Sequence, residues 1–94
     1  MNTATTILND LGYSEQQALH NFALLNASQK TAELEQENLF FQMKYKANFT
    51  EFEKMIQLRD EEIFEQEDDY LAWKFAVEGI DYWTSKISEL QNEH

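Results

Sequence analysis

The stretch Phe64–Leu90, FEQEDDYLAWKFAVEGIDYWTSKISEL, decides the fold that the sequence predicts. Four of its first six residues are acids, and five aromatic side chains follow at helical spacing. Apolar residues recur every three or four positions and predict one buried helical face: Trp73, Val77, Ile80, Trp83, Ile87 and Leu90. We expect Leu71, Phe75 and Tyr82 to widen this face, and we expect the helix to span residues 69–91.

A second long helix is expected near the N-terminus. Ser14 and Gln17 have the spacing of a capping box. The helix that they begin is predicted over residues 15–45, which corresponds to roughly 46 Å. The preceding residues 1–13 are expected to form a loose arm, with Gly12 interrupting the pattern.

A short helix is expected between the two long ones, over residues 51–59, because Thr50 and Glu53 repeat the capping-box spacing. The segment that follows favours a break or kink between residues 59 and 68, with Asp68 or Asp69 as the next N-cap. No helix-breaking residue stands there, however, so a continuous helix stays open as an alternative.

The composition agrees with an all-α fold. The 94 residues contain no Pro, two Gly and no Cys, so turns between strands and disulfides are not expected. We predict a single helical domain, residues 1–94, in which the helix at 69–91 packs antiparallel on the helix at 15–45.

The helix at 15–45 carries apolar residues on two sides, which suggests one face for the chain itself and one for a second subunit. A small domain also hides thirteen aromatic rings with difficulty. We therefore expect a homodimer, with these self-association residues: Phe22, Leu25, Leu34, Leu39 and Phe41. The polar middle of the helix, which includes Gln29 and Gln36, is either a solvated span or an interface that fixes register.

Charge is concentrated in the second half of the chain. The net charge is −11, and residues 60–69 hold seven acids and no base. This excess argues against direct binding of nucleic acid or an anionic membrane and favours a basic protein partner. The predicted partner-binding acidic residues are Glu61, Glu62, Glu65, Glu67, Asp68 and Asp69; the alternative is charge that serves solubility alone.

No arrangement of residues predicts catalysis. The two histidines, His20 and His94, lack the Glu-x-x-His spacing of helical di-metal sites, and no Gly-rich elbow surrounds a Ser. The acids could hold Ca²⁺ or Mg²⁺ weakly, but no EF-hand spacing is present. We expect no catalytic residue, cofactor or metal. No segment has the length of a signal peptide or membrane span, so a cytoplasmic protein is expected.

From Ala27 to Leu90 the chain resembles a group of small, acidic, helical bacterial and archaeal proteins. The matching segments are Phe41–Tyr45, Phe49–Glu53 and Glu65–Trp73, and Lys46-Ala47 replaces the group's usual Gly-Met. Most members have no known function, and some are regarded as antitoxins of toxin–antitoxin pairs. The resemblance implies a helical fold and supplies no catalytic residue.

These observations together predict a protein-binding module that is not an enzyme. The first hypothesis is an antitoxin-like protein that masks a small basic toxin with residues 60–69. The alternative is a structural homo-oligomerisation module with no dedicated partner, and a small metal-binding enzyme is a weaker third possibility.

Overall fold

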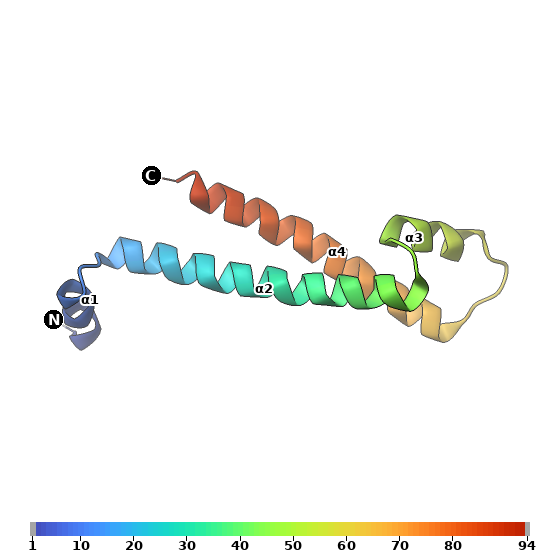
Figure 1. The fold of residues 1–94 in the computed structure, drawn as a ribbon, viewed down its shortest axis with the longest axis horizontal. Coiled ribbons are helices and arrows are strands. Elements are labelled where there is room, and N and C mark those ends of the chain that lie inside the picture. The colour runs from blue at the N-terminus through green and yellow to red at the C-terminus, as the bar shows by residue number, and fades with distance from the viewer. Residues whose placement is uncertain (1, 94) are drawn as a thin grey trace.

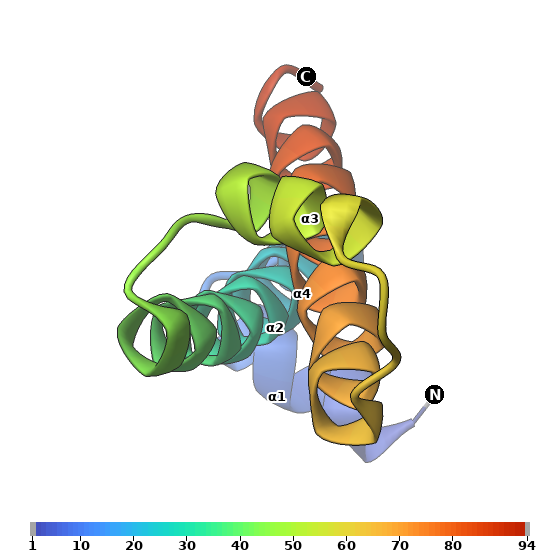
Figure 2. The ribbon, with the colours of Figure 1, turned by 90° about the vertical axis from the view of Figure 1, so that its right-hand side faces the viewer.

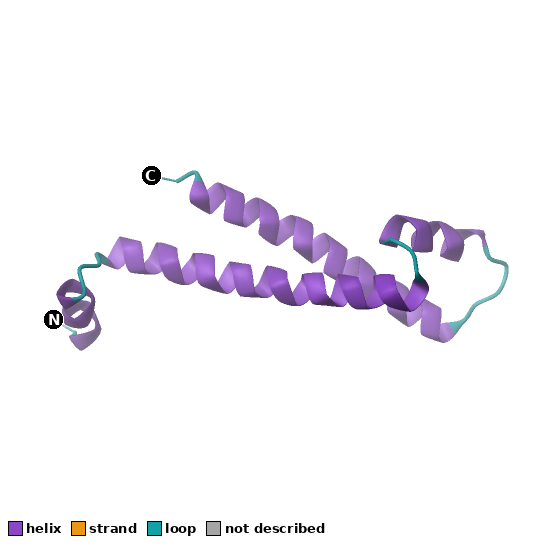
Figure 3. Ribbon diagram, in the orientation of Figure 1, coloured by secondary structure: helices purple, strands orange, loops and turns teal. Residues whose placement is uncertain are grey.

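The computed structural model describes residues 2–93 and contains helices and no strand within that range (Figures 1 and 3). The elements are α1 (Thr3–Asp10), α2 (Glu15–Tyr45), α3 (Phe49–Leu58) and α4 (Phe64–Gln91). The molecule measures 64 × 24 × 19 Å, with α2 and α4 antiparallel along it and α3 across one end (Figure 1). The all-α class and the packing of the two long helices are confirmed.

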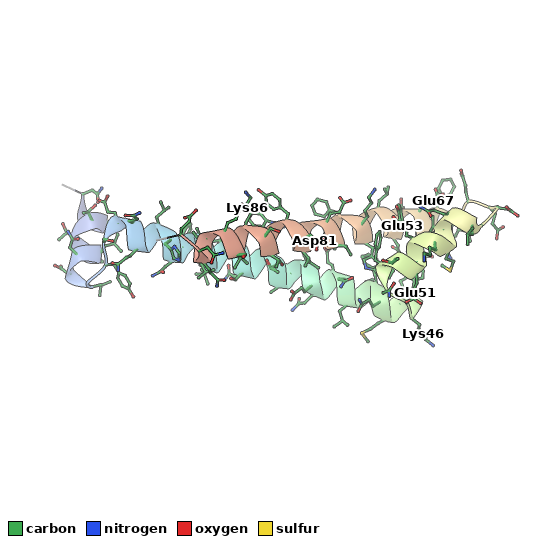
Figure 4. All side chains as sticks on the ribbon, turned by 90° about the horizontal axis from the view of Figure 1, so that it is seen from above. Lys46, Glu51, Glu53, Glu67, Asp81 and Lys86 are labelled. Carbon is green, nitrogen blue, oxygen red and sulfur yellow. The ribbon has the colours of Figure 1, made fainter. Side chains whose placement is uncertain are left out.

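Local hydrogen bonds set where α2 begins. Ser14 Oγ accepts from the Gln17 N–H at 3.1 Å, and Gln17 Oε1 accepts from the Ser14 N–H at 2.9 Å, as expected of a capping box. The helix ends at Tyr45 because Lys46 takes the left-handed conformation, with φ 53° and ψ 42°. Glycine is the usual residue at such a helix end. Figure 4 labels Lys46 at this turn and Glu51 on α3.

The N-terminal segment, which was expected to form a loose arm, contains the eight-residue helix α1. The Asn2 side chain caps this helix by accepting from the Thr5 N–H at 2.8 Å. Gly12 then turns the chain towards α2 with φ 87°, a conformation that favours glycine. No residue of α1 is buried, and both Ile7 and Leu11 remain exposed.

The predicted start of the short helix is wrong. Asn48, and not Thr50, provides the N-cap of α3, and the helix begins at Phe49. Asn48 Oδ1 accepts from the Glu51 N–H at 2.8 Å, and the Glu51 carboxylate accepts from the Asn48 N–H at 3.1 Å. A capping box is therefore present, but two residues earlier than the sequence pattern indicated.

The start of the last helix also differs from the prediction. α4 begins at Phe64, and Ile63 at the N-cap position makes no side-chain capping bond. Asp68 and Asp69 therefore lie inside the helix and do not cap it. The expected break is present between α3 and α4, over residues 59–63, so the two helices are not continuous.

The core lies at the end of the molecule where three helices meet (Figure 2). Trp73 of α4 is fully buried, Phe52 of α3 is 1% exposed and Phe41 of α2 is 7% exposed. The Trp73 ring centroid lies 5.6 Å from that of Phe41 and 5.1 Å from that of Phe52. Its indole N–H donates to Asn38 Oδ1 at 2.7 Å, so the buried polar atom is satisfied.

Farther along the molecule, Gly79 allows α2 and α4 to approach closely. A Cβ atom at this position would lie 2.6 Å from Leu34 Cδ1, well inside van der Waals contact. Leu34 is only 3% exposed and fills the space that the glycine leaves. The mid-helix glycine is thus explained by a leucine of the facing helix.

One face of α4 is more exposed than the sequence suggested. Trp73 and Ala76 are buried, and Val77, Ile80, Trp83, Ile87 and Leu90 are partly buried. Leu71, Phe75 and Tyr82 were expected to widen this buried face, but each exposes more than half of its surface. They stay exposed because a helix packed against a single long neighbour buries only one stripe.

Candidate protein-binding surfaces

The first candidate surface is the corner between α3 and α4, where the predicted acids lie. Arg59, the C-cap residue of α3, holds this corner by reaching the start of α4. Its guanidinium donates to Gln66 Oε1 and, at 3.2 Å, to Glu67 Oε1. The connection between the helices is thereby tied down at both of its ends.

A second set of polar contacts joins the end of α2 to the start of α4. Lys44 Nζ lies 2.8 Å from Glu65 Oε1 and 2.6 Å from Asp69 Oδ2, and the Tyr45 hydroxyl donates to the same Asp69 oxygen. Burial raises the pKa of Asp69, but the hydrogen bonds from Lys44 and Tyr45 outweigh it and hold that pKa below its usual value.

The same contacts shift the two donors. Burial and the hydrogen bond to Asp69 raise the pKa of Tyr45 to about 12. The hydrogen bonds to Asp69 and Glu65 raise the pKa of Lys44, so its ammonium stays charged at neutral pH. These contacts stabilise the fold, because the Lys44 ammonium is paired with carboxylates and the Tyr45 hydroxyl donates to a carboxylate of the same chain.

The six predicted acids therefore divide into two sets. Glu65 and Asp69 bind Lys44, and Glu67 binds Arg59. Glu61, Glu62 and Asp68 are exposed and form no ion pair with any residue between 2 and 93. Half of the predicted patch is thus occupied internally, and half is available to a partner.

The corner also exposes apolar side chains that the sequence reading did not select. Leu58 at the end of α3 is 82% exposed, and Phe64 at the start of α4 is 80% exposed. They flank the connection that carries Asp60, Glu61 and Glu62. The one sequence signal was an apolar residue on each side of an acidic run; helical periodicity alone assigns neither of them to the surface.

The second candidate surface is the outer face of α2. Phe22, Leu25 and Leu39, three of the residues predicted for self-association, each expose more than half of their surface. Leu34 and Phe41 from the same prediction are instead buried in the chain's own interface with α4. They belong to the opposite side of α2, about 200° around the helix from Ala32, and that side receives α4.

An open groove lies at the other end of the molecule, between the start of α2 and the end of α4. Its volume is about 1010 Å³, and its lining includes Tyr13, His20 and Leu90. His20 is partly buried there, whereas His94 lies outside the described residues. Between residues 2 and 93, no group of three or more His, Asp or Glu side chains is placed to hold a metal ion.

Two further observations concern the chain as a whole. Within the described part, none of the helices combines the length and apolar character needed to cross a membrane. Comparison with family models, with curated proteins and with solved structures finds no match to this chain.

Proposed function

We propose that the chain is a non-catalytic protein-binding module that recognises a basic protein partner with the corner between α3 and α4. The observation that carries this proposal is the exposure of Leu58 and Phe64 on either side of the acidic residues 60–62. Burial of apolar side chains favours association, and a few residues supply most of the binding energy, whereas charged residues around them orient the encounter.

The available acids match a partner with an apolar hollow bordered by Lys and Arg. Glu61, Glu62 and Asp68 have no cation within the described chain to neutralise them, so a partner's basic side chains are their natural counterions. Arg59 and Lys44 hold the surrounding backbone in place, which limits the conformational entropy that binding would cost.

Masking of a small basic toxin is the specific form of this function that we favour. Its support is the resemblance of residues 27–90 to a group that includes proteins regarded as antitoxins. A partner of this kind would have its basic surface covered by the corner and so be kept from its own target.

Charge reversal at the corner, with a matched control, tests the proposal. The test variant carries Glu61→Lys, Glu62→Lys and Asp68→Lys. The control carries Glu37→Lys, Asp81→Lys and Glu93→Lys, which reverse two Glu and one Asp at exposed sites elsewhere. Figure 4 labels Asp81 on α4. Glu65 and Asp69 are unsuitable targets, because their reversal would place lysines against Lys44.

Each protein is used for affinity capture from its native cells, and co-purifying chains are identified and quantified by mass spectrometry. We expect the wild type and the control to retain one small basic protein in stoichiometric amount, and the test variant to lose at least 90% of it. Equal capture by all three proteins, or no stoichiometric basic protein with the wild type, would refute the proposal.

A homo-oligomerisation module is the second candidate function. The uncovered apolar face of α2 favours it, and this face leads to a separate inference about what covers it.

A further inference from the structure

The long helix α2 carries two heptad patterns on opposite faces. The inner pattern alternates steps of four and three residues and faces α4 with buried or partly buried side chains: His20, Leu24, Ala27, Thr31, Leu34, Asn38, Phe41 and Tyr45. The outer pattern, which we call the outer seam, precedes it by two residues at every position: Ala18, Phe22, Leu25, Gln29, Ala32, Gln36, Leu39 and Met43. Beyond Ala18, every member of the outer seam is exposed.

The spacing of the outer seam is that of a coiled coil. Alternating steps of four and three give a repeat of 3.5 residues, which keeps one stripe facing a second helix along its whole length. The seam extends over 26 residues, about 39 Å of helix. A stripe of this length and period is typical of a helix that packs on another long helix.

The distribution of charge indicates which helix covers the outer seam. The chain has a net charge of −11, yet none of the eight seam positions carries a charged residue. Two copies can therefore bring their outer seams together while their acids remain in water. We propose that a second copy of this chain covers the outer seam, with α2 packed antiparallel against α2.

The antiparallel direction follows from the uneven charge along the molecule. Residues 60–69, with seven acids, lie at the end where α2 finishes (Figure 1). A parallel pair would place both acidic ends side by side, where like charges repel. An antiparallel pair places them at opposite ends of the assembly.

The antiparallel register also gives compatible layers. When residue numbers in facing positions add to 61, Phe22 faces the partner's Leu39 and Leu25 faces the partner's Gln36. Gln29 then faces the partner's Ala32, so the two Gln29 amides lie in adjacent layers near the two-fold axis. Polar residues at core positions of this kind specify register at some cost in stability.

A stable dimer needs a contact of sufficient area. A standard interface removes about 800 Å² from each partner. That is roughly a tenth of the 7352 Å² that this chain exposes. The eight residues of the outer seam are spread over 26 of the 94 residues, and Phe22 and Met43 each expose about two-thirds of their surface.

The mass of the protein in solution tests the interface. We expect wild-type protein at about 100 μM to have twice the 11.2 kDa chain mass by analytical ultracentrifugation. Leu25→Glu should give a monomer with unchanged helix content by circular dichroism. Leu71→Glu, an equally drastic change at an exposed leucine of α4, should stay dimeric. A monomeric wild type, or a dimeric Leu25→Glu variant, would overturn the proposal.

Cysteine cross-linking tests the direction, because the native chain has no Cys. In the antiparallel register, Leu25→Cys and Gln36→Cys face each other across the interface. Mixed and oxidised, these two variants should give a cross-linked heterodimer, whereas each variant alone should give almost none. Cross-linking of Leu25→Cys with itself would show a parallel pair, and no cross-link in the mixture would reject the register.

The test does not depend on the corner between α3 and α4. A dimer without a basic partner would support this inference and reject the proposed function. A monomer that captures a basic partner through the corner would do the reverse.

Discussion

The two ends of the α2–α4 pair differ in how completely they bury their side chains. Where α3 crosses the pair, Trp73 and Phe52 lose nearly all of their exposure to solvent. At the opposite end α1 contributes no buried residue, Trp83 stays partly exposed, and an open groove lies between the start of α2 and the end of α4. Two helices bury one stripe each, whereas a third helix encloses the side chains between them.

Polar contacts follow the same division. The closed end combines the aromatic cluster with the bonds of Lys44 and Tyr45 to Asp69 and with the bond from Trp73 to Asn38. At the open end, Ile7 of α1 remains exposed, and Thr5 Oγ1 donates to Glu15 Oε1 at 3.0 Å. We infer that the closed end provides most of the stability of the monomer.

Removing one tryptophan from each end tests this difference most directly. Trp73→Ala should cost about 3–5 kcal/mol, which is the usual loss for a fully buried large side chain. Trp83→Ala should cost roughly half as much, because part of its surface already contacts water. Urea denaturation at one fixed protein concentration measures both, and equal losses would contradict the inferred division of stability.

The Asp69 contacts give the closed end a dependence on pH. The pKa of Asp69 is lower in the folded chain than in the unfolded chain. At pH values between and near these two pKa values, the folded state therefore binds fewer protons than the unfolded state. The contribution is present above the unfolded pKa of about 3.9 and is lost as pH falls through the folded pKa. Asp69→Asn should cost about 1.5–3 kcal/mol at pH 7, the range for hydrogen bonds to charged groups.

The exposed neighbour Asp68 supplies the matched control. Asp68→Asn should change the free energy of unfolding by less than about 0.5 kcal/mol at both pH 7 and pH 3, as is usual for exposed sites. The difference between wild type and Asp69→Asn should shrink between pH 7 and pH 3. A difference that stays constant over that interval would exclude the carboxylate as its source.

Sequence reasoning succeeded where the signals were local. The capping box of Ser14 and Gln17 set the start of α2, and the apolar periodicity of α4 identified Trp73 as a core residue. The start of α4 was missed because Ile63 provides no side-chain cap. The contacts that accompany this start come from Arg59 and from Lys44, which lies 21 residues before Glu65.

The candidate surfaces were predictable only in part for a related reason. Adjacent acids in the sequence appeared as one patch, but helical geometry turns Asp69 towards α2 and leaves Asp68 exposed. Both faces of α2 are apolar, so the sequence does not say which one receives α4. The close approach of Gly79 to Leu34 decides it, and that contact joins residues far apart in the chain.

The contact between Gly79 and Leu34 lies between the two ends and tests how tightly the pair is packed there. Ala is favoured over Gly in a helix by about 1 kcal/mol, but overpacking of a buried site costs about 1–3 kcal/mol. Gly79→Ala should therefore lower the free energy of unfolding by about 1 kcal/mol. In a Leu34→Ala background, Gly79→Ala should be neutral or stabilising. If Gly79→Ala alone were more stable than wild type, α2 and α4 would be loosely packed at this point.

The smallest expected effect concerns the turn that brings α3 over the pair. Lys46 holds a left-handed conformation, which costs a non-glycine residue about 1 kcal/mol. Lys46→Gly should raise the free energy of unfolding by about 0.5–1 kcal/mol, because glycine adopts this conformation readily. The gain falls short of the full cost where glycine also increases the conformational entropy of the unfolded chain. Lys46→Ala removes the same side chain and keeps the strain, so it should give no gain. Equal stability of the two variants would mean that the turn is not strained. The connection between α2 and α3 would then impose no energetic cost on the closed end.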